Sequence, residues 1–263
     1  MEKKDLDDSA ELLNDFTRIK KTGVLKVAID YNSYNYFIYR GKPMGFEYEL
    51  LQTLSNDLDV KLEIIVSNNL NESFNGLKNK RFDVIAQNLT ITSERNAETD
   101  FTIPFEQTHQ VLVQRAKTGK LTDSLYVNSV LELANKKVFV QQNSAYHQRL
   151  INLSEEIGAH IDIISDSVYG VEELISLVAK GEIDYTICDE NIGKLNKFYY
   201  PNLDVSLPVS FQQNIAWAVR KGSDEWKAWL DKWIAEIKGT RKFNHLYYKY
   251  FESPRIVERK SSE

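Results

Sequence analysis

Apolar and polar positions follow two different periods along the chain, and their alternation predicts an α/β fold. Short apolar runs of the strand type occur at 24–30, 61–66, 82–89, 136–142, 160–165 and 182–190. Segments whose apolar residues recur every three or four positions lie between them, as on the buried face of a helix. These segments predict helices at 46–58, 71–80, 143–158 and 171–180. Strands that alternate with helices are typical of a mostly parallel sheet flanked by helices.

The middle of the chain repeats the construction of its first part, which indicates two lobes. The stretch GLKNKRFDVIAQN can be laid over SLVAKGEIDYTICD, because each leads from a helix end through a basic residue into a strand. Two extended stretches, 109–117 and 211–221, are expected to carry the chain to the second lobe and back. The expected organisation is a polar lead-in at 1–22, lobe 1 at 23–110, lobe 2 at 111–212, a return to lobe 1 at 213–255, and a tail at 256–263.

The return segment is expected to close lobe 1 with two helices, at 223–239 and 243–251. The first carries an apolar stripe formed by Trp226, Trp229, Leu230, Trp233, Ile234 and Ile237. A tryptophan stripe at helical spacing is far more often part of a core than a binding platform, so we interpret these residues as core. Asp224 and Glu225 in the first turn and Gly239 at the end fit the electrostatics and capping of a helix.

Composition removes several classes of function. The 263 residues are 42% hydrophobic and 27% charged, which is ordinary for a globular protein, and the net charge of -5 without a basic block argues against a nucleic-acid partner. The single Cys188 excludes an internal disulfide, and four scattered histidines give no metal-ligand spacing. Neither a GxGxxG nor a P-loop motif occurs, so no cofactor is expected.

The chain shows neither a membrane span nor a signal peptide. Its apolar runs fall short of the roughly 18–20 residues that cross a bilayer, and it begins with the charged MEKKDLDDSA. The protein is therefore expected to be cytosolic or to begin after a removed leader.

Polar and aromatic residues follow the predicted strands, at the ends where ligands bind in open α/β sheets. These strand ends lie at 30–36, 88–92, 142–146 and 188–191. Two lobes facing each other would bring the four ends into one cleft. Lobes joined by two strands can close by hinge motion around a small molecule.

The side chains at these ends divide by charge. Arg95 offers a planar fork of donors that fits a carboxylate, and Thr90 could add a donor to the same oxygens. Asp189, from the other lobe, offers a carboxylate for an ammonium, while Ser144 lies at a helix start that favours anions. One positive and one negative anchor suit a zwitterion such as an amino acid or a peptide. Its apolar part could be covered by Tyr31, Tyr34 and Tyr36.

Structural roles compete with each of these assignments. Arg95 alone could be a solvated surface residue, and Asp189 could be a helix cap or half of a salt bridge. We favour ligand contact for both, and for Arg95 the reason is its place after a strand, beside Thr90 and Thr92. Ser144 could equally be only an N-cap, and the tyrosines could belong to the core.

Four stretches carry a resemblance to a known family: GFEYEL (45–50), LKNKRFDVIAQNLTITSERNAETDFTIPF (77–105), KKVFVQQNSA (136–145) and GEIDYTICDE (181–190). They resemble the periplasmic solute-binding proteins of the polar amino-acid type, in order and spacing, over about 23–251. The resemblance implies the two-lobed fold of type II periplasmic binding proteins, with Arg95 on the ligand carboxylate and Asp189 on its ammonium. It also implies ligand contacts by Thr90, Gln87, Asn88, Gln141, Ser144, Tyr34 and Leu70.

Within this family, GEIDYTICDENI and IAWAVRKGSDEW resemble the N-terminal regulatory domain of membrane-bound lytic murein transglycosylase F. In that branch, a solute-binding-like domain senses cell-wall peptides and regulates the lysozyme-like catalytic domain that follows it. The resemblance implies a non-catalytic, monomeric regulatory half without its leader, periplasmic and tethered to the outer membrane, whose partner is the transglycosylase domain. Gln87 and Asn88 replace small serines of the amino-acid binders, which favours a larger ligand such as a muropeptide.

Two other functions remain open on the same fold. One is a stand-alone periplasmic amino-acid-binding protein of an ABC transporter, which the coding sequence beyond residue 263 would distinguish. The other is an enzyme similar to cyclohexadienyl dehydratases, in which paired carboxylates such as Glu47 and Asp189 could act as acid and base. Turnover of prephenate or arogenate would identify it.

Overall fold

The computed structural model describes residues 14–119 and 124–252, and these form two compact units. Unit 1 contains the described residues up to Glu106 together with Ile215–Tyr250. Unit 2 contains the described part of Gln107–Asn214 and the last two described residues, 251–252. The chain thus leaves unit 1 after Glu106 and returns to it at Ile215, so that unit 1 is assembled from two separate pieces. The tail at 256–263 and most of the lead-in at 1–22 lie outside the described residues.

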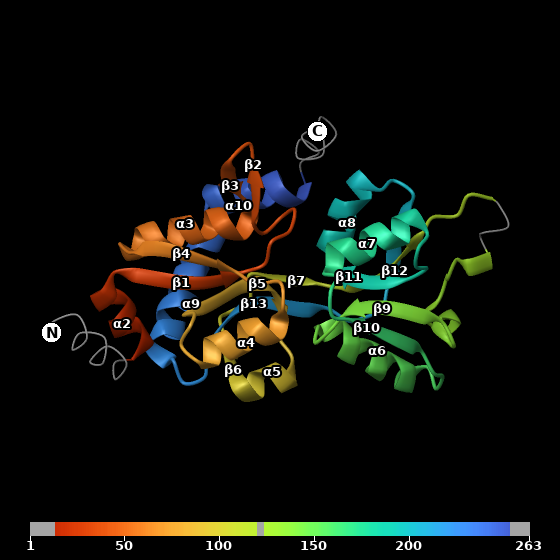
Figure 1. The fold of residues 1–263 in the computed structure, drawn as a ribbon, viewed down its shortest axis with the longest axis horizontal. Coiled ribbons are helices and arrows are strands. Elements are labelled where there is room, and N and C mark those ends of the chain that lie inside the picture. The colour runs from red at the N-terminus through yellow and green to blue at the C-terminus, as the bar shows by residue number, and fades with distance from the viewer. Residues whose placement is uncertain (1–13, 120–123, 253–263) are drawn as a thin grey trace. The chain divides into compact units, whose positions relative to one another are not determined.

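The sheet of unit 1 places a returning strand in its interior. Its order is β4 (Lys61–Val66), β1 (Val24–Ile29), β5 (Val84–Thr90), β13 (Gln213–Arg220) and β6 (Thr99–Phe101), with β7 (Glu106–Thr108) also paired to β13. Strand β1 pairs in parallel with β4 and β5, whereas β13 runs antiparallel to both β5 and β6 (Figure 1). Four of the five strands on this path therefore share one direction.

Unit 2 repeats the same arrangement. Its sheet has the order β10 (Asp162–Asp166), β9 (Lys137–Gln141), β11 (Thr186–Asp189), β8 (Gln110–Arg115) and β12 (Leu203–Pro208). Strand β9 pairs in parallel with β10 and β11, and β8 runs antiparallel to β11 and β12. The predicted mostly parallel α/β architecture is confirmed, and 76–88 and 176–189 correspond to the helix–strand pairs α4–β5 and α7–β11.

The predicted helices are confirmed. In unit 1 the described helices are α2 (Asp15–Thr22), α3 (Phe46–Leu58), α4 (Leu70–Lys78), α5 (Ser93–Glu98), α9 (Asp224–Lys238) and α10 (Arg241–Tyr247). The π-helical turn η3 (Tyr248–Glu252) follows α10, and its last two residues are assigned to unit 2. The described helices of unit 2 are α6 (Ala145–Glu156), α7 (Val171–Lys180), α8 (Glu190–Tyr199) and a 3-10 turn, η2 (Val130–Leu133). Sequence patterns missed α5, α8, β6, β7, β12, η2 and the hairpin β2 (Phe37–Tyr39) and β3 (Lys42–Met44).

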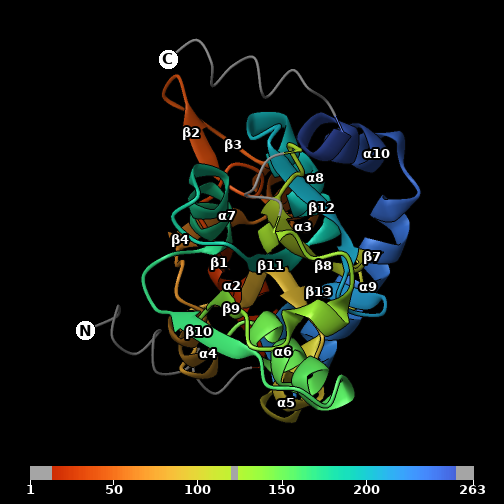
Figure 2. The same ribbon diagram turned by 90° about the vertical axis from the view of Figure 1, so that its right-hand side faces the viewer.

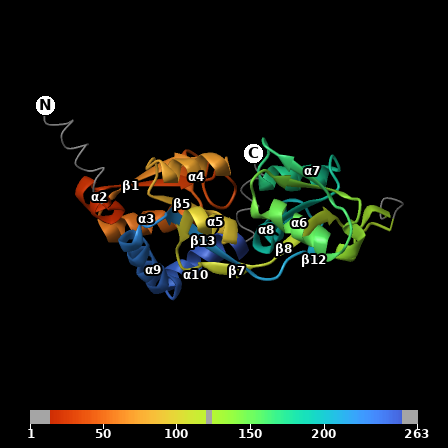
Figure 3. The ribbon, with the colours of Figure 1, turned by 90° about the horizontal axis from the view of Figure 1, so that it is seen from below.

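The apolar stripe of α9 is core, as predicted, except for Trp229, which is half-buried and stacks on Trp226 and Phe16. Trp226, Leu230 and Ile234 are fully buried, and Trp233 stacks on Trp217 of β13 with ring centroids 6.3 Å apart. Helix α4 covers the opposite face, where its residues pack on a cluster that includes Ile85. Figure 3 shows α4 and α9 on opposite sides of β5 and β13.

In unit 2, helices also cover both faces of the sheet. Tyr146 and Leu150 of α6 pack with Leu112 and Ile187 of the neighbouring strands β8 and β11. The other face lies against α8, where Cys188 Sγ would be 3.2 Å from a Cβ at Gly193. Figure 2 shows α6 and α8 on opposite sides of this sheet.

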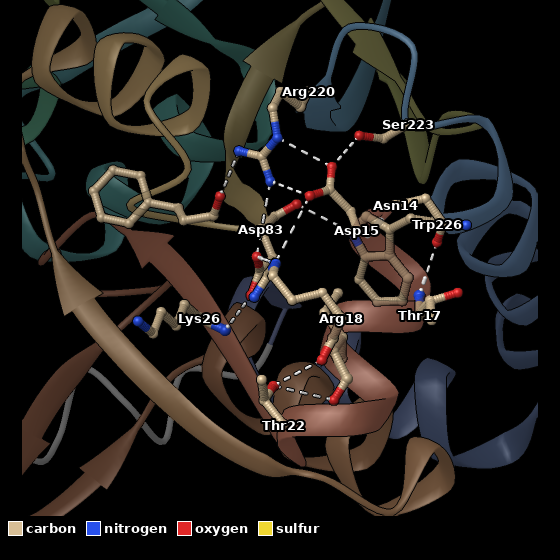
Figure 4. A network of polar contacts seen from close by, with 12 residues as sticks. Asn14, Asp15, Thr17, Arg18, Thr22, Lys26, Asp83, Arg220, Ser223 and Trp226 are labelled. Atoms are coloured by element: carbon tan, nitrogen blue, oxygen red, sulfur yellow. Dashed lines mark hydrogen bonds and ion pairs between the residues drawn. The ribbon is translucent and has the colours of Figure 1, made fainter. Parts of the chain in front are cut away.

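A charged network fastens α2 to the amino ends of β1 and β5. Arg220 grips Asp15 with two hydrogen bonds, Nη2–Oδ1 at 2.7 Å and Nε–Oδ2 at 3.0 Å. Arg18 pairs with the buried Asp83, whose Oδ2 also accepts from the backbone N–H of Lys26 at 2.8 Å. Figure 4 shows the two arginines pointing toward the two aspartates. The network holds one end of the sheet, which leaves the carboxyl ends of the strands for the residues assigned to ligand.

Candidate functional site

Arg95 is positioned at the carboxyl end of β5 by a short local structure. Thr90 ends the strand, and Thr92 caps α5 by accepting the N–H of Arg95 at its Oγ1, 3.2 Å away. The Arg95 side chain folds back, so that Nη1 donates to the carbonyl of Thr90 at 2.9 Å. Its guanidinium carbon lies 5.4 Å from the ring centre of Phe74 on α4. The guanidinium is therefore fixed beside a strand end, and Arg95 is not a freely solvated residue.

The loop after β1 is fixed by asparagine side chains. Asp30 accepts hydrogen bonds from the side-chain amides of Asn32 and Asn35. Asn68, after β4, accepts the N–H of Tyr31 at 2.7 Å and donates to its carbonyl at 3.2 Å. Tyr34 is 3% exposed, so most of its surface is used inside unit 1. Tyr31 remains exposed, although its backbone is held from both sides.

Two residues of unit 1 that were predicted to contact ligand, Gln87 and Leu70, lie at or beside the start of α4. Gln87 is buried, and its Nε2 donates to the carbonyl of Ser67 at 2.8 Å and to Ser73 Oγ at 3.2 Å. Leu70, at the start of α4, is half-buried against the core cluster under that helix. Both therefore serve packing in this structure. Asn88, the next residue of β5, is half-buried and points to the opposite face.

Asp189 lies at the carboxyl end of β11 and is completely buried. It occupies the N-cap position of α8, but its side chain makes no capping hydrogen bond. Its Oδ2 instead accepts from the hydroxyl of Tyr146, 3.1 Å away. Burial, followed by the negative charge of Asp189, raises the pKa of Tyr146 well above its ordinary value, so this phenol stays protonated as a donor. Asp189 is therefore the N-cap residue of α8 by position, but its side chain does not cap the helix.

Ser144 is the N-cap residue of α6, yet its hydroxyl does not cap the helix. The Oγ atom is buried and has no hydrogen-bond partner among the described residues. Gln141, the last residue of β9, accepts the backbone N–H of Ser144 at 3.2 Å, which fixes the turn into the helix. The structure thus brings Ser144 and Gln141 together at the start of α6.

Sequence reasoning missed two residues of this corner of unit 2. Tyr146 follows Ser144 by two positions and reaches Asp189 from the first turn of α6. Gln110 is directly opposite Asp189 in the β8–β11 ladder, and its Oε1 is a second buried atom without a partner in the described part of the chain. The period-two pattern of β8 places Gln110 on the same face as Leu112 and Gln114, which could have shown that polar side chains enter the buried face of this strand.

Glu47, considered above for acid–base chemistry, lies in the first turn of α3. It is 5% exposed, and its Oε2 accepts from Trp217 Nε1 at 2.8 Å. Burial raises the pKa of Glu47 to about 8. Glu47 belongs to unit 1 and Asp189 to unit 2. The observed partner of Glu47 is thus a core tryptophan.

Residues 14–119 and 124–252 contain no group of three or more histidine, cysteine or acidic side chains arranged to hold a metal ion. Within the same ranges, helices are too short or too polar to cross a membrane.

Sequence comparison gives one family match and a set of relatives. The family described as "Bacterial extracellular solute-binding proteins, family 3" matches residues 25–253. A protein of Desulfosudis oleivorans named membrane-bound lytic murein transglycosylase F is 31% identical over 234 residues, which cover 89% of this chain and 50% of that protein. The chain therefore spans about half the length of the curated relatives it matches.

Solved structures share the fold. A mutant of ArgBP from T. maritima superposes with a TM-score of 0.77 at 23% identity, covering 91% of this chain and 100% of that one. The ancestral amino acid-binding protein AncCDT-1, described as a precursor of cyclohexadienyl dehydratase, gives a TM-score of 0.76 at 22% identity, with coverage of 90% and 99%. At these identities the likeness establishes the fold alone.

Proposed function

Because the chain belongs to family 3 of the bacterial extracellular solute-binding proteins, we propose that it binds a small zwitterionic ligand, an amino acid or a cell-wall peptide. In this proposal Arg95 binds the ligand carboxylate and Asp189 its ammonium. Thr90, Asn88, Gln141, Ser144, Tyr34 and Leu70 complete the proposed set. The donor of Gln87 is occupied within unit 1, so only its carbonyl oxygen could take part.

One observation carries the proposal: equivalent strand ends in the two units carry opposite charges. Arg95 lies in the first turn of α5, and its guanidinium donates to the carbonyl of Thr90, the last residue of β5. Asp189 ends β11, the strand that occupies the same place in the sheet of unit 2. Both side chains are held by hydrogen bonds within their own unit. A guanidinium and a carboxylate fixed in advance bind a zwitterion at low cost in conformational entropy.

We further propose that the chain is the regulatory part of a larger periplasmic protein tethered to the outer membrane. The relative from Desulfosudis oleivorans carries the name of a lytic murein transglycosylase, and this chain matches half of it. On this basis the chain itself is a monomer without catalysis or a bound cofactor, and its ligand is a muropeptide or amino acid. Ligand binding would shift the population of a closed form and so modulate an attached transglycosylase domain.

Calorimetric titration of the 263-residue chain with the protein amino acids and with a peptidoglycan stem tripeptide tests ligand binding. We expect at least one of them to bind and Arg95→Ala to weaken its binding by roughly 100-fold, the scale of a lost charge-assisted pair. Arg241→Ala, which changes an exposed arginine in the first turn of α10, is the control. A wild-type protein that binds none of these compounds, or an Arg95→Ala protein that binds as well as wild type, would contradict the proposal.

The alternative is a stand-alone amino-acid-binding protein, because the matched family is one of extracellular solute-binding proteins. The reading frame after codon 263 separates the two: a lysozyme-like segment supports the regulatory role, and an immediate stop codon supports the alternative. A dehydratase is disfavoured because Glu47 bonds to Trp217 inside unit 1. We expect no turnover of prephenate or arogenate.

A further inference from the structure

We propose that Gln110 is a specificity-determining residue whose side-chain carbonyl accepts a hydrogen bond from the ligand's ammonium, beside Asp189. This inference rests on the function proposed above. It adds a requirement, because the ligand must then carry a free primary ammonium rather than an acylated nitrogen.

The strand register places the Gln110 side chain next to that of Asp189. Strands β8 and β11 are antiparallel, and Gln110 is directly opposite Asp189. Directly opposed residues of an antiparallel pair project from the same face of the sheet. On this face Leu112 and Ile187 pack against α6, and the Tyr146 hydroxyl reaches Asp189. Gln110 and Asp189 thus lie side by side on the face of the sheet that α6 covers.

Gln110 is held in place by its backbone. Its N–H donates to Ser210 Oγ at 2.8 Å, and its carbonyl accepts the N–H of Val209 at 2.8 Å. The residue is only 2% exposed, and Oε1 has no partner within the described residues. Buried polar atoms are nearly always paired, so this acceptor at a strand end is available to a donor from outside the chain. Ser144 Oγ is a second such atom, on the turn that leads to Tyr146.

The side chains of Asp189, Gln110 and Ser144 are suited to a ligand that donates hydrogen bonds. Asp189 supplies a carboxylate, Gln110 an amide oxygen and Ser144 a hydroxyl that can accept. A primary ammonium has three N–H donors, and it carries the charge that a buried carboxylate favours. An acylated nitrogen has one donor and no charge, so it would leave acceptors unpaired in a buried site.

Two variants of one residue test the assignment. Gln110→Met keeps the length of the side chain and removes the amide, whereas Gln110→Glu keeps an acceptor and adds negative charge. The control is Gln148→Met, an exposed glutamine on α6. The probes are the protein amino acids and the peptidoglycan stem tripeptide, each free and N-acetylated, titrated by calorimetry into the 263-residue chain.

We expect Gln110→Met to weaken binding by roughly 10- to 100-fold, the range for a hydrogen bond to a charged group, and Gln110→Glu to retain or tighten it. N-acetylated probes should not bind the wild type. If the Gln110 amide instead donates to Asp189, Gln110→Glu will place two carboxylates together and weaken binding, which overturns the proposal. Wild-type binding that Gln110→Met leaves unchanged overturns the role of Gln110 alone. A wild type that binds no probe overturns the proposed function together with this inference.

Discussion

At the scale of single residues, the two charged side chains chosen from sequence differ in how their surroundings hold them. Arg95 is half-buried, donates a hydrogen bond to the carbonyl of Thr90 and lies over the ring of Phe74. Asp189 is completely buried and accepts a hydrogen bond from the hydroxyl of Tyr146 on α6. Both could be chosen because a charge directly after an apolar strand is unusual. Gln110 and Tyr146 could not, because their roles depend on register and on the helix placed over the sheet.

The buried Glu47 makes the stability of unit 1 depend on pH. Burial raises its pKa from 4.5 to about 8, so between these values the folded protein keeps a proton that the unfolded chain releases. The free energy of unfolding should therefore fall as pH rises through this window, by at most about 1.4 kcal/mol per unit. Glu47→Gln keeps an acceptor for Trp217 and should remove this decline.

Urea denaturation of wild type and Glu47→Gln at about pH 5 and about pH 8 measures the difference. The variant should gain stability relative to wild type as pH rises, whereas the exposed Glu63→Gln should not. Equal stability changes for Glu47→Gln at both pH values would show that Glu47 is ionised throughout.

At the scale of elements, the start of α3 is where the loop after β1 and the helix meet most closely. Gly45 has a φ of +136°, and a Cβ there would lie 2.1 Å from the carbonyl oxygen of Asn35. Its N–H donates to the hydroxyl of the fully buried Tyr250 at 3.0 Å. Only glycine fits this contact, which ties the loop, the helix and the end of the described chain together.

Gly45→Ala should therefore destabilise the protein by about 3 kcal/mol, since it combines backbone strain with a clash against backbone. Gly239→Ala is the matched control, because Gly239 ends α9 with a negative φ and open space around it. We expect that control to change stability by less than about 1 kcal/mol. Thermal unfolding followed by circular dichroism compares the two, and equal effects would contradict the close approach at Gly45.

The docking of α2 depends on Arg220. This side chain binds Asp15 twice, lies 3.8 Å from Asp83 and donates to the carbonyl of Phe82 at 2.9 Å. Arg220→Met would leave the buried Asp15 without the cation that binds it twice, while Asp83 keeps Arg18, and it should cost about 3–5 kcal/mol. Arg241→Met, at an exposed position, should cost little. Urea unfolding measures both, and a loss below about 1 kcal/mol for Arg220→Met would show that α2 is held by its apolar contacts instead.

Long helices could be predicted from the sequence, whereas several short elements could not. α3, α7 and α9 carry enough turns to show an apolar stripe, and each was recognised with its bounds to within a residue or two. α5 has six residues and no buried position, so no stripe exists to be found. β12 was missed although Leu203, Val205 and Leu207 alternate with polar residues along it.

At the scale of the whole molecule, the chain order inserts one unit within the other. Unit 2 is drawn almost entirely from one uninterrupted segment, Gln107–Asn214, and its sheet and core lie within that segment. Unit 1 needs both of its pieces, because β13 from the second piece separates β5 from β6 in the sheet. Sequence repetition predicted two lobes, and the two extended stretches at 109–117 and 211–221 predicted that the chain returns to the first of them.

The inserted segment should therefore fold by itself. A fragment of residues 107–214 is expected to show cooperative thermal unfolding by circular dichroism. A fragment of residues 1–106 should not, because without β13 the sheet ends at β5 and the buried Trp217, Trp226 and Leu230 are missing from the core. Cooperative unfolding of the 1–106 fragment would show that the returning strand is dispensable.

The aromatic core of α9 has an optical consequence. All four tryptophans of the chain, at positions 217, 226, 229 and 233, lie in the returning piece of unit 1. Emission excited near 295 nm, roughly the red edge where tyrosine no longer absorbs, therefore reports on unit 1 alone, while far-ultraviolet dichroism averages over both units. The protein carries its own domain-selective label, and a divergence between the two signals during denaturation would resolve the unfolding of one unit from that of the other without any added dye.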